Sequence, residues 1–381
     1  MKIAIVRQRY NPYGGAERFV ERALGALVQE GAQVTLITRS WDGAPAAGFA
    51  QITCDPPYSR LWGGRAARDA SFARCAQQAM AEGGFDITQS HERIPGCRIF
   101  RAGDGVHAAW LEHRARARAR GGLTRWLDRL SGFHRYILAQ ERAMLTHPAL
   151  ARVICNSRLV AEEMQRYYGV PEEKLVLIEN GVDLEHFHPR LAAAHRVELR
   201  GRLGIAAEAP LFLYVGGGFE RKGVPRLLRA FAAMASQEAH LLVVGGDRSL
   251  KAMSRLADSL GIGERVVFTG PQKDVRPYYG AADAFVLPTL YDPMPNAALE
   301  ALACGLPTIT STSCGIAARI REGENGYVGD ALDLPLLTRH LEALAAPGRA
   351  AAMRDAARAS VQDLSLAAMA ERLVALYRSL A

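Results

Sequence analysis

Short apolar runs alternate with segments of helical spacing along this chain, and the alternation begins twice. An apolar run at residues 2–7 leads through a glycine turn and an amphipathic segment at 16–29 to a second apolar run at Gln33–Thr38. Leu211–Val215 then starts the same order again. Strands that are joined through helices form a parallel sheet. The sequence therefore predicts an α/β protein of two Rossmann-like parallel-sheet halves, with helices up to the end of the chain.

Composition limits the class of protein. Of 381 residues, 49% are hydrophobic, yet no apolar run reaches the roughly 18 residues that cross a membrane. The chain begins directly on an apolar run, so no secretory leader is expected. Its six cysteines form no Cys-x-x-Cys pair, which predicts reduced thiols in a cytoplasmic protein and no zinc site.

The net charge of +8 is concentrated in the first half. Residues 1–190 hold 26 Lys and Arg against 20 Asp and Glu, whereas the rest of the chain holds 21 against 19. An excess of positive charge predicts anionic partners: phosphorylated small molecules, a membrane surface or nucleic acid. No helix-turn-helix, zinc-finger spacing or RNA-binding aromatic motif accompanies the charge, so nucleic acid is the least favoured partner.

Glycines and polar clusters follow the predicted strands of the first half. Gly14 and Gly15 lie in the first strand–helix turn, where a ligand can approach the backbone, but the turn lacks the Gly-x-Gly-x-x-Gly of dinucleotide sites. Asp104 and His107 follow one strand, and residues 90–93 (Ser-His-Glu-Arg) follow the strand before it. Open α/β sheets bind ligands at such strand ends, so Asp104 and His107 are candidate functional residues. Ordinary surface side chains are the alternative.

Residues 112–129 are rich in arginine and poor in acids. The arginines are Arg114, Arg116, Arg118, Arg120, Arg125 and Arg129. Only Glu112 and Asp128 oppose them, and Trp126 and leucines lie among them. Arginines at every second position fall on different helical faces, so no amphipathic helix is predicted. A basic segment with Trp and Leu suits an anionic lipid surface or a phosphorylated acceptor; a solvated basic loop or helix is the alternative.

A glycine-rich loop opens the second half. Gly216, Gly217 and Gly218 follow the predicted strand, and Arg221 and Lys222 precede the next helix. Glycines permit close backbone approach and two cations can neutralise phosphate charge, so the loop is a candidate anion site. Its spacing differs from Gly-x-x-x-x-Gly-Lys-Ser/Thr, which disfavours ATP hydrolysis. Cations that merely flank a turn are the alternative.

Two carboxylates lie in the stretch at residues 285–309. A short strand at 285–287 is predicted to end in a proline-bounded loop, and a helix starts near Asn296. Asp292 lies in the loop and Glu300 one turn into the helix. Amide groups at a helix start bind anions or hydroxyls, and carboxylates accept from hydroxyls, so the stretch suits a phosphorylated, polyhydroxylated ligand. Two solvated acids in an ordinary turn are the alternative.

These motifs together resemble the family-4 retaining glycosyltransferases of GT-B fold. The matching segments are the turn at residues 14–15, residues 179–183 (Glu-Asn-Gly-Val-Asp), the loop at 216–223 and the stretch at 292–300, which span nearly the whole chain. Within the family the chain most resembles the lipopolysaccharide core glucosyltransferase I group, through residues 10–15, 40–43, 93–96 and 102–104.

The resemblance implies a domain organisation and an activity. An acceptor-binding domain at residues 1–188 is expected to face a nucleotide-sugar domain at 189–360 across a cleft, with a helix at 361–381 packing back on the first domain. The implied reaction moves a hexose, with UDP-glucose the favoured donor, to a heptose of the lipopolysaccharide inner core with retention. The protein is then expected in the cytoplasm, peripheral on the inner membrane, with the region Arg114–Arg129 on the anionic surface.

Donor-site residues follow from the resemblance position by position. Arg221 and Lys222 would bind the donor diphosphate and stabilise it as the leaving group. Asp292 would face the hydroxyls of the sugar, and Glu300 would accept from the ribose. The other expected donor contacts, mostly through the backbone, are Gly14, Gly15, Gly217, Met294, Pro295, Asn296 and Ala297. The family has Glu at both ends of this Glu-x7-Glu stretch. Asp292 has a shorter side chain than Glu, which would affect how far its carboxylate reaches toward the sugar and which donor is chosen.

The acceptor side rests on fewer residues. Asp104 is expected to orient or activate the acceptor hydroxyl. His107 has no family match and is a substrate-binding candidate from its placement alone. No cofactor and no metal are expected, because the chain has no Asp-x-Asp pair and Arg221 and Lys222 would substitute for a bridging metal.

Other functions fit the same residues. One is a different enzyme of the same fold: a sugar-nucleotide epimerase, or a transferase with a polysaccharide or another lipid as acceptor. The other is a catalytically silent sugar-nucleotide binder or membrane scaffold. Arg221, Lys222 and Glu300 are all present, which favours an enzyme over a silent binder.

Overall fold

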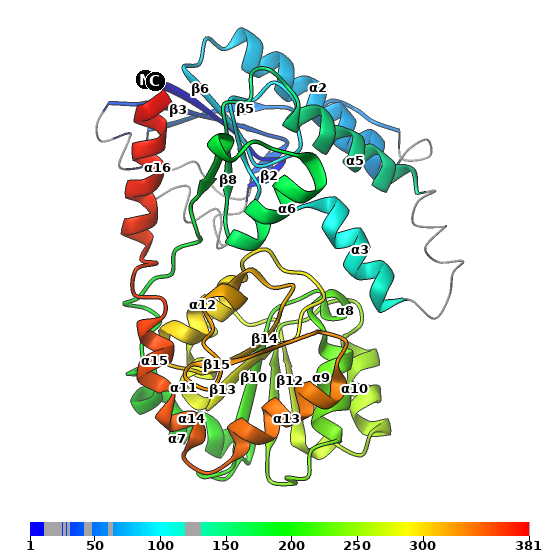
Figure 1. Ribbon diagram of the computed structural model, residues 1–381, viewed down its shortest axis with the longest axis vertical. Coiled ribbons are helices and arrows are strands. Elements are labelled where there is room, and N and C mark those ends of the chain that lie inside the picture. The colour runs from blue at the N-terminus through cyan, green and yellow to red at the C-terminus, as the bar shows by residue number, and fades with distance from the viewer. Residues whose placement is uncertain are drawn as a thin grey trace. The chain divides into compact units, whose positions relative to one another are not determined.

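The structure is a computed structural model that describes residues 1–10, 25, 28, 31–41, 48–59, 64–118 and 131–380. By their internal contacts the residues form two compact units (Figure 1). The first comprises Met1–Gly181 together with Leu366–Ala381, and the second comprises Val182–Ser365. The predicted helix at residues 16–29 lies largely outside the described residues.

The first unit is built on a seven-stranded parallel sheet in the order β5-β3-β1-β6-β7-β8-β9. Its strands are β1 (Lys2–Val6), β3 (Gln33–Thr38), β5 (Phe49–Thr53), β6 (Ile87–Ser90), β7 (Ile99–Arg101), β8 (Arg152–Cys155) and β9 (Leu175–Leu177). A separate parallel pair is β2 (Arg9–Tyr10) and β4 (Ser40–Trp41). The helices are α2 (Gly64–Glu82), α3 (His107–Ala117), α5 (Gly132–Leu145), α6 (Arg158–Tyr168) and α16 (Leu366–Leu380), with a 3-10 turn η1 (Glu172–Lys174).

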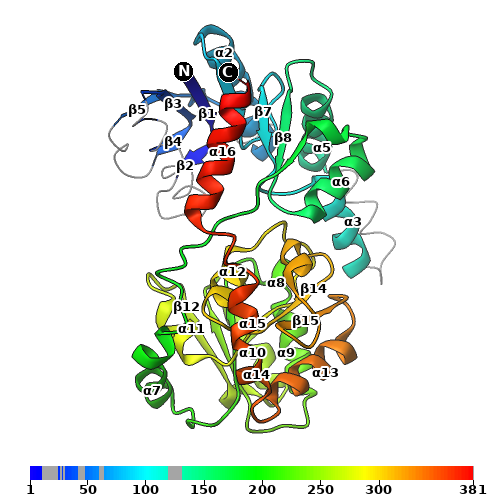
Figure 2. The same ribbon diagram turned by 60° about the vertical axis from the view of Figure 1, so that its left-hand side comes forward.

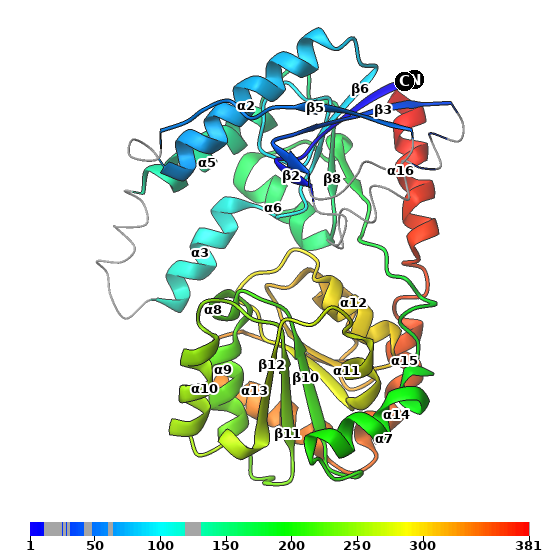
Figure 3. The same ribbon diagram turned by 180° about the vertical axis from the view of Figure 1, so that it is seen from behind.

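The last helix of the chain, α16, completes the core of this unit. Its residues Met369, Leu373 and Tyr377, spaced four apart on one helical face, are buried against apolar side chains of β1, β3 and β6. Burying each such aliphatic side chain stabilises the fold by about 1.5–3 kcal/mol. The Tyr377 hydroxyl donates to Gln89 Oε1 at 2.8 Å. Figure 2 shows α16 along this sheet, with the two chain termini beside each other. In the same unit, α2 packs against α5 (Figure 3).

The second unit has a six-stranded parallel sheet in the order β12-β11-β10-β13-β14-β15. Its strands are β10 (Leu211–Val215), β11 (His240–Val244), β12 (Val266–Gly270), β13 (Ala284–Leu287), β14 (Thr308–Ser311) and β15 (Gly326–Gly329). Its helices are α7 (Leu191–Leu203), α8 (Phe219–Lys222), α9 (Val224–Ala232), α10 (Leu250–Ser259), α11 (Arg276–Ala281), α12 (Asn296–Ala303), α13 (Leu334–Ala345), α14 (Arg349–Ala352) and α15 (Arg354–Ala359), with 3-10 turns η2 (Gly263–Arg265) and η3 (Gly315–Arg319).

In both sheets the first strand is central and the chain winds outward to one side, then returns to fill the other. This is the doubly wound order of Rossmann-like folds, so the predicted fold class of two parallel-sheet domains is confirmed. Strands β10 and β13 are apolar and fully buried, as near-continuous hydrophobic runs in a covered parallel sheet require.

The structure corrects several local predictions. Among the helices expected toward the end of the chain, one is interrupted at Met353 and forms α14 and α15. The arginine-rich segment begins in the helix α3, and a basic helix was one of the alternatives left open for it. The loop at residues 216–223 contains the single helical turn α8. Strands β5 and β15 were not predicted from the sequence. The first is an edge strand with mostly exposed side chains, and the second is short and bounded by glycine, so neither forms a continuous apolar run.

Two cysteines are paired, which corrects the prediction of reduced thiols. Cys54 and Cys75 form a disulfide with their Cα atoms 5.7 Å apart. Cys97, Cys155, Cys304 and Cys314 are free and buried. The pair was not predictable, because the two residues are 21 positions apart in no recognisable motif and meet only where the end of β5 lies on α2.

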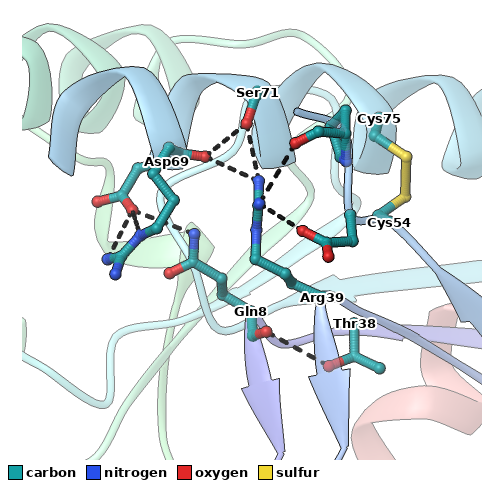
Figure 4. A network of polar contacts seen from close by, with 10 residues as sticks. Gln8, Thr38, Arg39, Cys54, Asp69, Ser71 and Cys75 are labelled. Carbon is teal, nitrogen blue, oxygen red and sulfur yellow. Dashed lines mark hydrogen bonds and ion pairs between the residues drawn. A yellow bond between two sulfur atoms is a disulfide. The ribbon is translucent and has the colours of Figure 1, made fainter. Parts of the chain in front are cut away.

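An arginine lies beside this disulfide and ties the same edge of the sheet to α2. The Arg39 guanidinium donates to Asp55 at 2.6 Å, to the Ser71 hydroxyl at 2.7 Å and to the Arg68 carbonyl at 3.0 Å (Figure 4). The Pro56 carbonyl is a fourth acceptor at 3.4 Å. Only 9% of the Arg39 side chain is exposed, and its acceptors hold the loop after β3 against the helix.

In the second unit, Gly223 lies where two loops come close together. It has φ 84°, and a Cβ at this position would lie 2.0 Å from the Pro288 carbonyl oxygen. Both the left-handed backbone and the close approach require glycine. The loop after β10 therefore lies directly against the loop after β13.

Replacing Gly223 tests this contact. Gly223→Ala is expected to lower the free energy of unfolding by well over about 1 kcal/mol, because the new methyl group adds a clash to the backbone strain. Gly261→Ala is the matched control, since Gly261 has φ 71° and a Cβ there would meet nothing within 4 Å. Urea unfolding of both variants measures the difference. Equal losses would contradict the close contact between the two loops.

Candidate functional site

The carboxyl ends of β10 and β13 form the switch point of the second sheet. These strands are neighbours, although β11 and β12 lie between them in the sequence. Ligands of open α/β sheets bind at this position. The two loops that leave the strands are joined by hydrogen bonds: Leu290 N–H donates to the Arg221 carbonyl at 2.8 Å, and the Thr289 hydroxyl donates to it at 3.2 Å. The glycine loop and the proline-bounded loop are thus parts of one site.

Three charged side chains meet there. Asp292 Oδ2 lies 3.4 Å from an Arg221 terminal nitrogen and 3.4 Å from Lys222 Nζ. Arg221 also donates to the Tyr291 carbonyl at 2.6 Å. The side chains of Asp292 and Lys222 are 10% and 15% exposed, and that of Arg221 is 37% exposed. One carboxylate between two cations leaves a net positive charge, which suits a bound diphosphate.

The backbone around Asp292 is held on both sides. Its N–H donates to the Ser313 carbonyl at 3.2 Å, and its carbonyl accepts from Gly315 N–H at 2.9 Å. The Ser313 hydroxyl in turn donates to the Thr289 carbonyl at 3.2 Å. The position of the carboxylate is therefore set by the loop after β14, which lies far along the chain.

An aspartate that sequence reasoning missed anchors the glycine loop. Asp247, after β11, accepts from Phe219 N–H at 2.7 Å at the start of α8. Burial raises the pKa of Asp247, but hydrogen bonds from Ser249, Phe219 and Gly218 outweigh it and the pKa is lowered overall. Gly217 lies beside the same loop, where a Cβ would be 3.0 Å from the Gly246 carbonyl oxygen. A short turn residue such as Asp247 gives no sequence signal until β11 is placed beside β10.

The start of α12 provides the rest of this site. Met294 and Pro295 are buried, and Asn296 and Ala297 form the first helical turn, with no side-chain cap from Pro295. The amide groups of a first helical turn point away from the helix and carry partial positive charge. The structure thus brings the predicted donor-site residues of the second half to one edge of the sheet.

Glu300 lies on the same helix and has a partner that was not predicted. The Tyr279 hydroxyl lies 2.8 Å from Glu300 Oε2 and 3.1 Å from the Ala297 carbonyl oxygen, and its single proton is donated to the nearer, charged carboxylate. Burial raises the pKa of Tyr279 well above its ordinary value, and the neighbouring Glu300 carboxylate adds to the rise. A buried phenol that stays protonated orients the carboxylate, because its only role toward Glu300 is that of donor.

A large hollow of a different kind lies away from this site. The cavity, of about 1070 Å³, opens near the amino ends of the strands and is lined by Arg196, Asp283 and Arg354 among others. Asp283 pairs with Arg196 at 2.8 Å and with Arg200 at 2.6 Å. The lining holds Arg196 and Arg354 against four acids, Glu208, Glu238, Asp283 and Glu342. Because the acids outnumber the arginines, the carboxyl ends of the strands remain the better site for an anion.

In the first unit, Arg93 joins the two polar clusters that follow β6 and β7. Its Nε donates to Glu141 at 2.8 Å, and a terminal nitrogen donates to the Gly105 carbonyl at 2.9 Å. Asp104 is exposed in the loop after β7, and His107 is the first residue of α3 and half-buried. The clusters are therefore neighbours at one edge of the sheet, as their placement after successive strands predicted.

Glu141 is the residue that holds this edge together, and sequence reasoning missed it. Its side chain is fully buried and accepts from Arg93, from the His107 backbone N–H at 3.1 Å and from the Tyr168 hydroxyl at 2.5 Å. The carboxylate thereby caps the amino end of α3, where its negative charge also interacts favourably with the positive end of the helix dipole. A signal existed: Glu141 shares a helical face with Ile137 and Leu145, where an acid is unusual.

The His107 imidazole is neutral across the physiological range. Burial lowers its pKa to about 3, and the positive charge of Arg93, with His134 and Arg114, acts in the same direction. The ring therefore acts toward a ligand through a single N–H and a single lone pair rather than as a cation.

Several predicted residues fall where no structure is described. Gly14 and Gly15 lie outside the described residues, as do Arg120, Arg125 and Arg129 of the basic segment. Within the described ranges, no group of three His, Cys, Asp or Glu side chains is arranged to hold a metal ion. Nor does any described helix combine the length and the apolar character needed to cross a bilayer.

Comparisons with known proteins indicate the family of this chain. Two family models match: Glycosyltransferase Family 4 over residues 13–186 and Glycosyl transferases group 1 over residues 209–346. Lipopolysaccharide glucosyltransferase WaaG of Escherichia coli is 28% identical over 331 residues, covering 86% of this chain and 85% of that protein. D-inositol 3-phosphate glycosyltransferase of Xylanimonas cellulosilytica is 26% identical over 375 residues, covering 91% and 87%. The crystal structure of WaaG, a glycosyltransferase involved in lipopolysaccharide biosynthesis, matches with a TM-score of 0.82 at 25% identity, over 98% of this chain and 99% of that one.

The position of Asp292 between two cations can be tested with inorganic pyrophosphate. Asp292→Asn is expected to tighten pyrophosphate binding by about fivefold, or about 1 kcal/mol, because Arg221 and Lys222 lose the carboxylate that competes with the anion. Asp274→Asn is the control, since Asp274 pairs with Arg276 on the surface of the same unit. Isothermal titration calorimetry measures both. Unchanged or weaker binding in Asp292→Asn would show that the carboxylate does not compete for the cations.

Proposed function

Because the chain belongs to the family-4 glycosyltransferases of GT-B fold, we propose that it is a retaining hexosyltransferase that uses a UDP-sugar, with UDP-glucose favoured, and glycosylates the heptose region of the lipopolysaccharide inner core. The observation that carries the proposal is the meeting of Arg221, Lys222 and Asp292 at the switch point beside the start of α12. Similarity to WaaG of E. coli supports the choice of donor and acceptor.

The cations serve the leaving group. When the bond between the anomeric carbon and the diphosphate breaks, negative charge develops on the phosphate oxygen. Arg221 and Lys222 are already in place to stabilise that charge, and such prearranged charge supplies a large part of many rate enhancements. In this proposal they act in place of a metal ion, so no metal or other cofactor is required.

Retention places both bond changes on one face of the sugar. The acceptor oxygen bonds to the anomeric carbon as the bond to the diphosphate oxygen breaks, and the acceptor proton passes to the departing phosphate oxygen. Asp104 would orient the acceptor hydroxyl, and Gly14 and Gly15 would contact the diphosphate. Asp292 would turn toward the sugar hydroxyls once phosphate takes its place beside the two cations.

The nucleoside and the sugar would be held by α12 and its preceding loop. Glu300, oriented by Tyr279, would accept hydrogen bonds from the ribose hydroxyls. The backbone at the start of the helix would contact sugar and phosphate, through Met294, Pro295, Asn296 and Ala297.

The basic segment suggests where the protein works. Arg116 and Arg118 are exposed on and just after α3, and an acceptor anchored in lipid lies at a membrane surface. We therefore place the protein in the cytoplasm, peripheral on the inner membrane, with this segment against anionic headgroups.

A second acceptor class has support of its own. The D-inositol 3-phosphate glycosyltransferase of X. cellulosilytica matches over 91% of this chain. A small phosphorylated polyol is thus the alternative acceptor, with a silent sugar-nucleotide binder as the remaining alternative function. Donor binding with no turnover on any acceptor would favour the silent binder.

The role of Arg221 is tested by transfer assays. Arg221→Ala is expected to lower kcat by about 100- to 1000-fold, as loss of one prearranged donor to a developing oxyanion does elsewhere. Product is identified by mass spectrometry with UDP-glucose, UDP-galactose and UDP-N-acetylglucosamine as donors, and with heptosylated lipid A or inositol 3-phosphate as acceptors. Arg339→Ala, on the exposed face of α13, is the control. Near-normal turnover by a folded Arg221→Ala variant would overturn the assignment.

Membrane attachment is tested on vesicles. Replacing Arg116 and Arg118 together by glutamine is expected to weaken binding to vesicles that contain phosphatidylglycerol by roughly 30-fold, at about 1 kcal/mol for each charge. The same double change at Arg255 and Arg339, exposed on α10 and α13, is the control. Co-sedimentation measures the bound fraction. Equal binding by both variants would leave the segment without a role at the membrane.

A further inference from the structure

His134 and Arg114, two residues outside the site described so far, form a series of hydrogen bonds with His107. His107 Nε2 lies 3.1 Å from His134 Nδ1, and His134 Nε2 lies 3.0 Å from an Arg114 terminal nitrogen. Arg114 extends from α3, the helix that His107 begins, and His134 extends from α5. The two imidazole rings have their centroids 5.2 Å apart.

The direction of these hydrogen bonds follows from the arginine. A guanidinium has only N–H groups and cannot accept, so His134 Nε2 must supply a lone pair. His134 then carries its proton on Nδ1 and donates it toward His107 Nε2. That atom of His107 in turn must accept, and the proton of its neutral ring is left on Nδ1. Each step is forced by the one before it, because an imidazole with one proton has one donor and one acceptor.

His107 is also held at its backbone. Its N–H donates to both carboxylate oxygens of the buried Glu141 at 3.1 Å. Glu141 is itself paired with Arg93 from the neighbouring loop. His107 is therefore held at two points: Glu141 fixes the position of its backbone, and His134 fixes the orientation of its imidazole ring. Such support is what a binding side chain needs to offer one defined hydrogen bond.

We propose that His134 and Arg114 are positioning residues that hold His107 in the Nδ1–H tautomer, so that His107 binds a sugar hydroxyl oxygen of the substrate as a hydrogen-bond donor. In this arrangement His107 Nε2 accepts the hydrogen bond from His134 and therefore takes no proton from the acceptor substrate. The inference rests on the proposed function for the nature of the substrate, whereas the tautomer does not depend on it. Arg114 then belongs with this site and not with the lipid-facing arginines Arg116 and Arg118.

The tautomer can be read directly. In protein labelled with 15N-histidine, long-range proton–nitrogen NMR spectra distinguish a protonated from an unprotonated ring nitrogen. The His107 signals are assigned by their loss in His107→Asn. The wild-type protein is expected to carry the proton on Nδ1. A proton on Nε2 of His107 would overturn the proposal outright.

Four variants test the chain. Arg114→Met removes the N–H that donates to His134, and His134→Phe removes the N–H that donates to His107. Each change is expected to shift the His107 tautomer ratio toward Nε2–H by about 3- to 10-fold. His134→Gln is the rescue, because its amide can accept from Arg114 and donate to His107 in the same sense. Arg135→Met removes an exposed arginine beside His134 and is the control. An unchanged ratio in folded His134→Phe would show that His134 does not set the tautomer.

Activity separates this inference from the proposed function. If transfer occurs, His107→Asn is expected to retain roughly 10-fold more kcat/KM than His107→Gln, since an Asn amide reproduces the position of Nδ1–H and a Gln amide that of Nε2. Better activity of His107→Gln would overturn the donor role. If the wild-type protein transfers no hexose to any acceptor while the tautomer shifts as expected, the proposed function fails and the positioning of His107 stands.

Discussion

The contact between Gly223 and the Pro288 carbonyl is the constraint on which the site of the second unit depends. It lets the loop after β10 lie directly on the loop after β13, with no side chain between them. The Arg221 carbonyl then accepts from Leu290 N–H, and the Arg221 and Lys222 side chains reach Asp292. Two weak local signals, a glycine loop with cations and a loop with an acid, become one site for this reason.

Two cations and one carboxylate share this site, which leaves it with a net positive charge. Two neighbouring cations repel each other, and Asp292 relieves the repulsion by lying between them. In the proposed function, a bound diphosphate would provide the same relief with more charge and more acceptor atoms.

The first unit uses a buried carboxylate for a related purpose. Glu141 accepts hydrogen bonds from Arg93, from the backbone at the start of α3 and from Tyr168, so three segments that are distant in the sequence meet at one side chain. A fully buried acid is tolerated only because its oxygens have donors and one partner is a cation. Sequence reasoning placed Asp104 and His107 at a functional edge but missed this support, because the only signal for Glu141 is an acid on the apolar face of a helix, and that signal does not say which residues the acid binds.

The sequence by itself determined the secondary structure and the local chemistry of this protein. The apolar runs of β1, β3, β10 and β13 and the start of α12 are properties of neighbouring residues, and they were predictable to within a residue or two. Tertiary structure alone decided the strand order and the pairs that depend on it: Arg221 with Asp292 across 71 positions, Arg93 with Glu141 across 48, and Cys54 with Cys75 across 21. The physical reason is that hydrophobic periodicity reports which face of an element is buried, whereas the neighbour that covers this face is chosen by packing of the whole sheet.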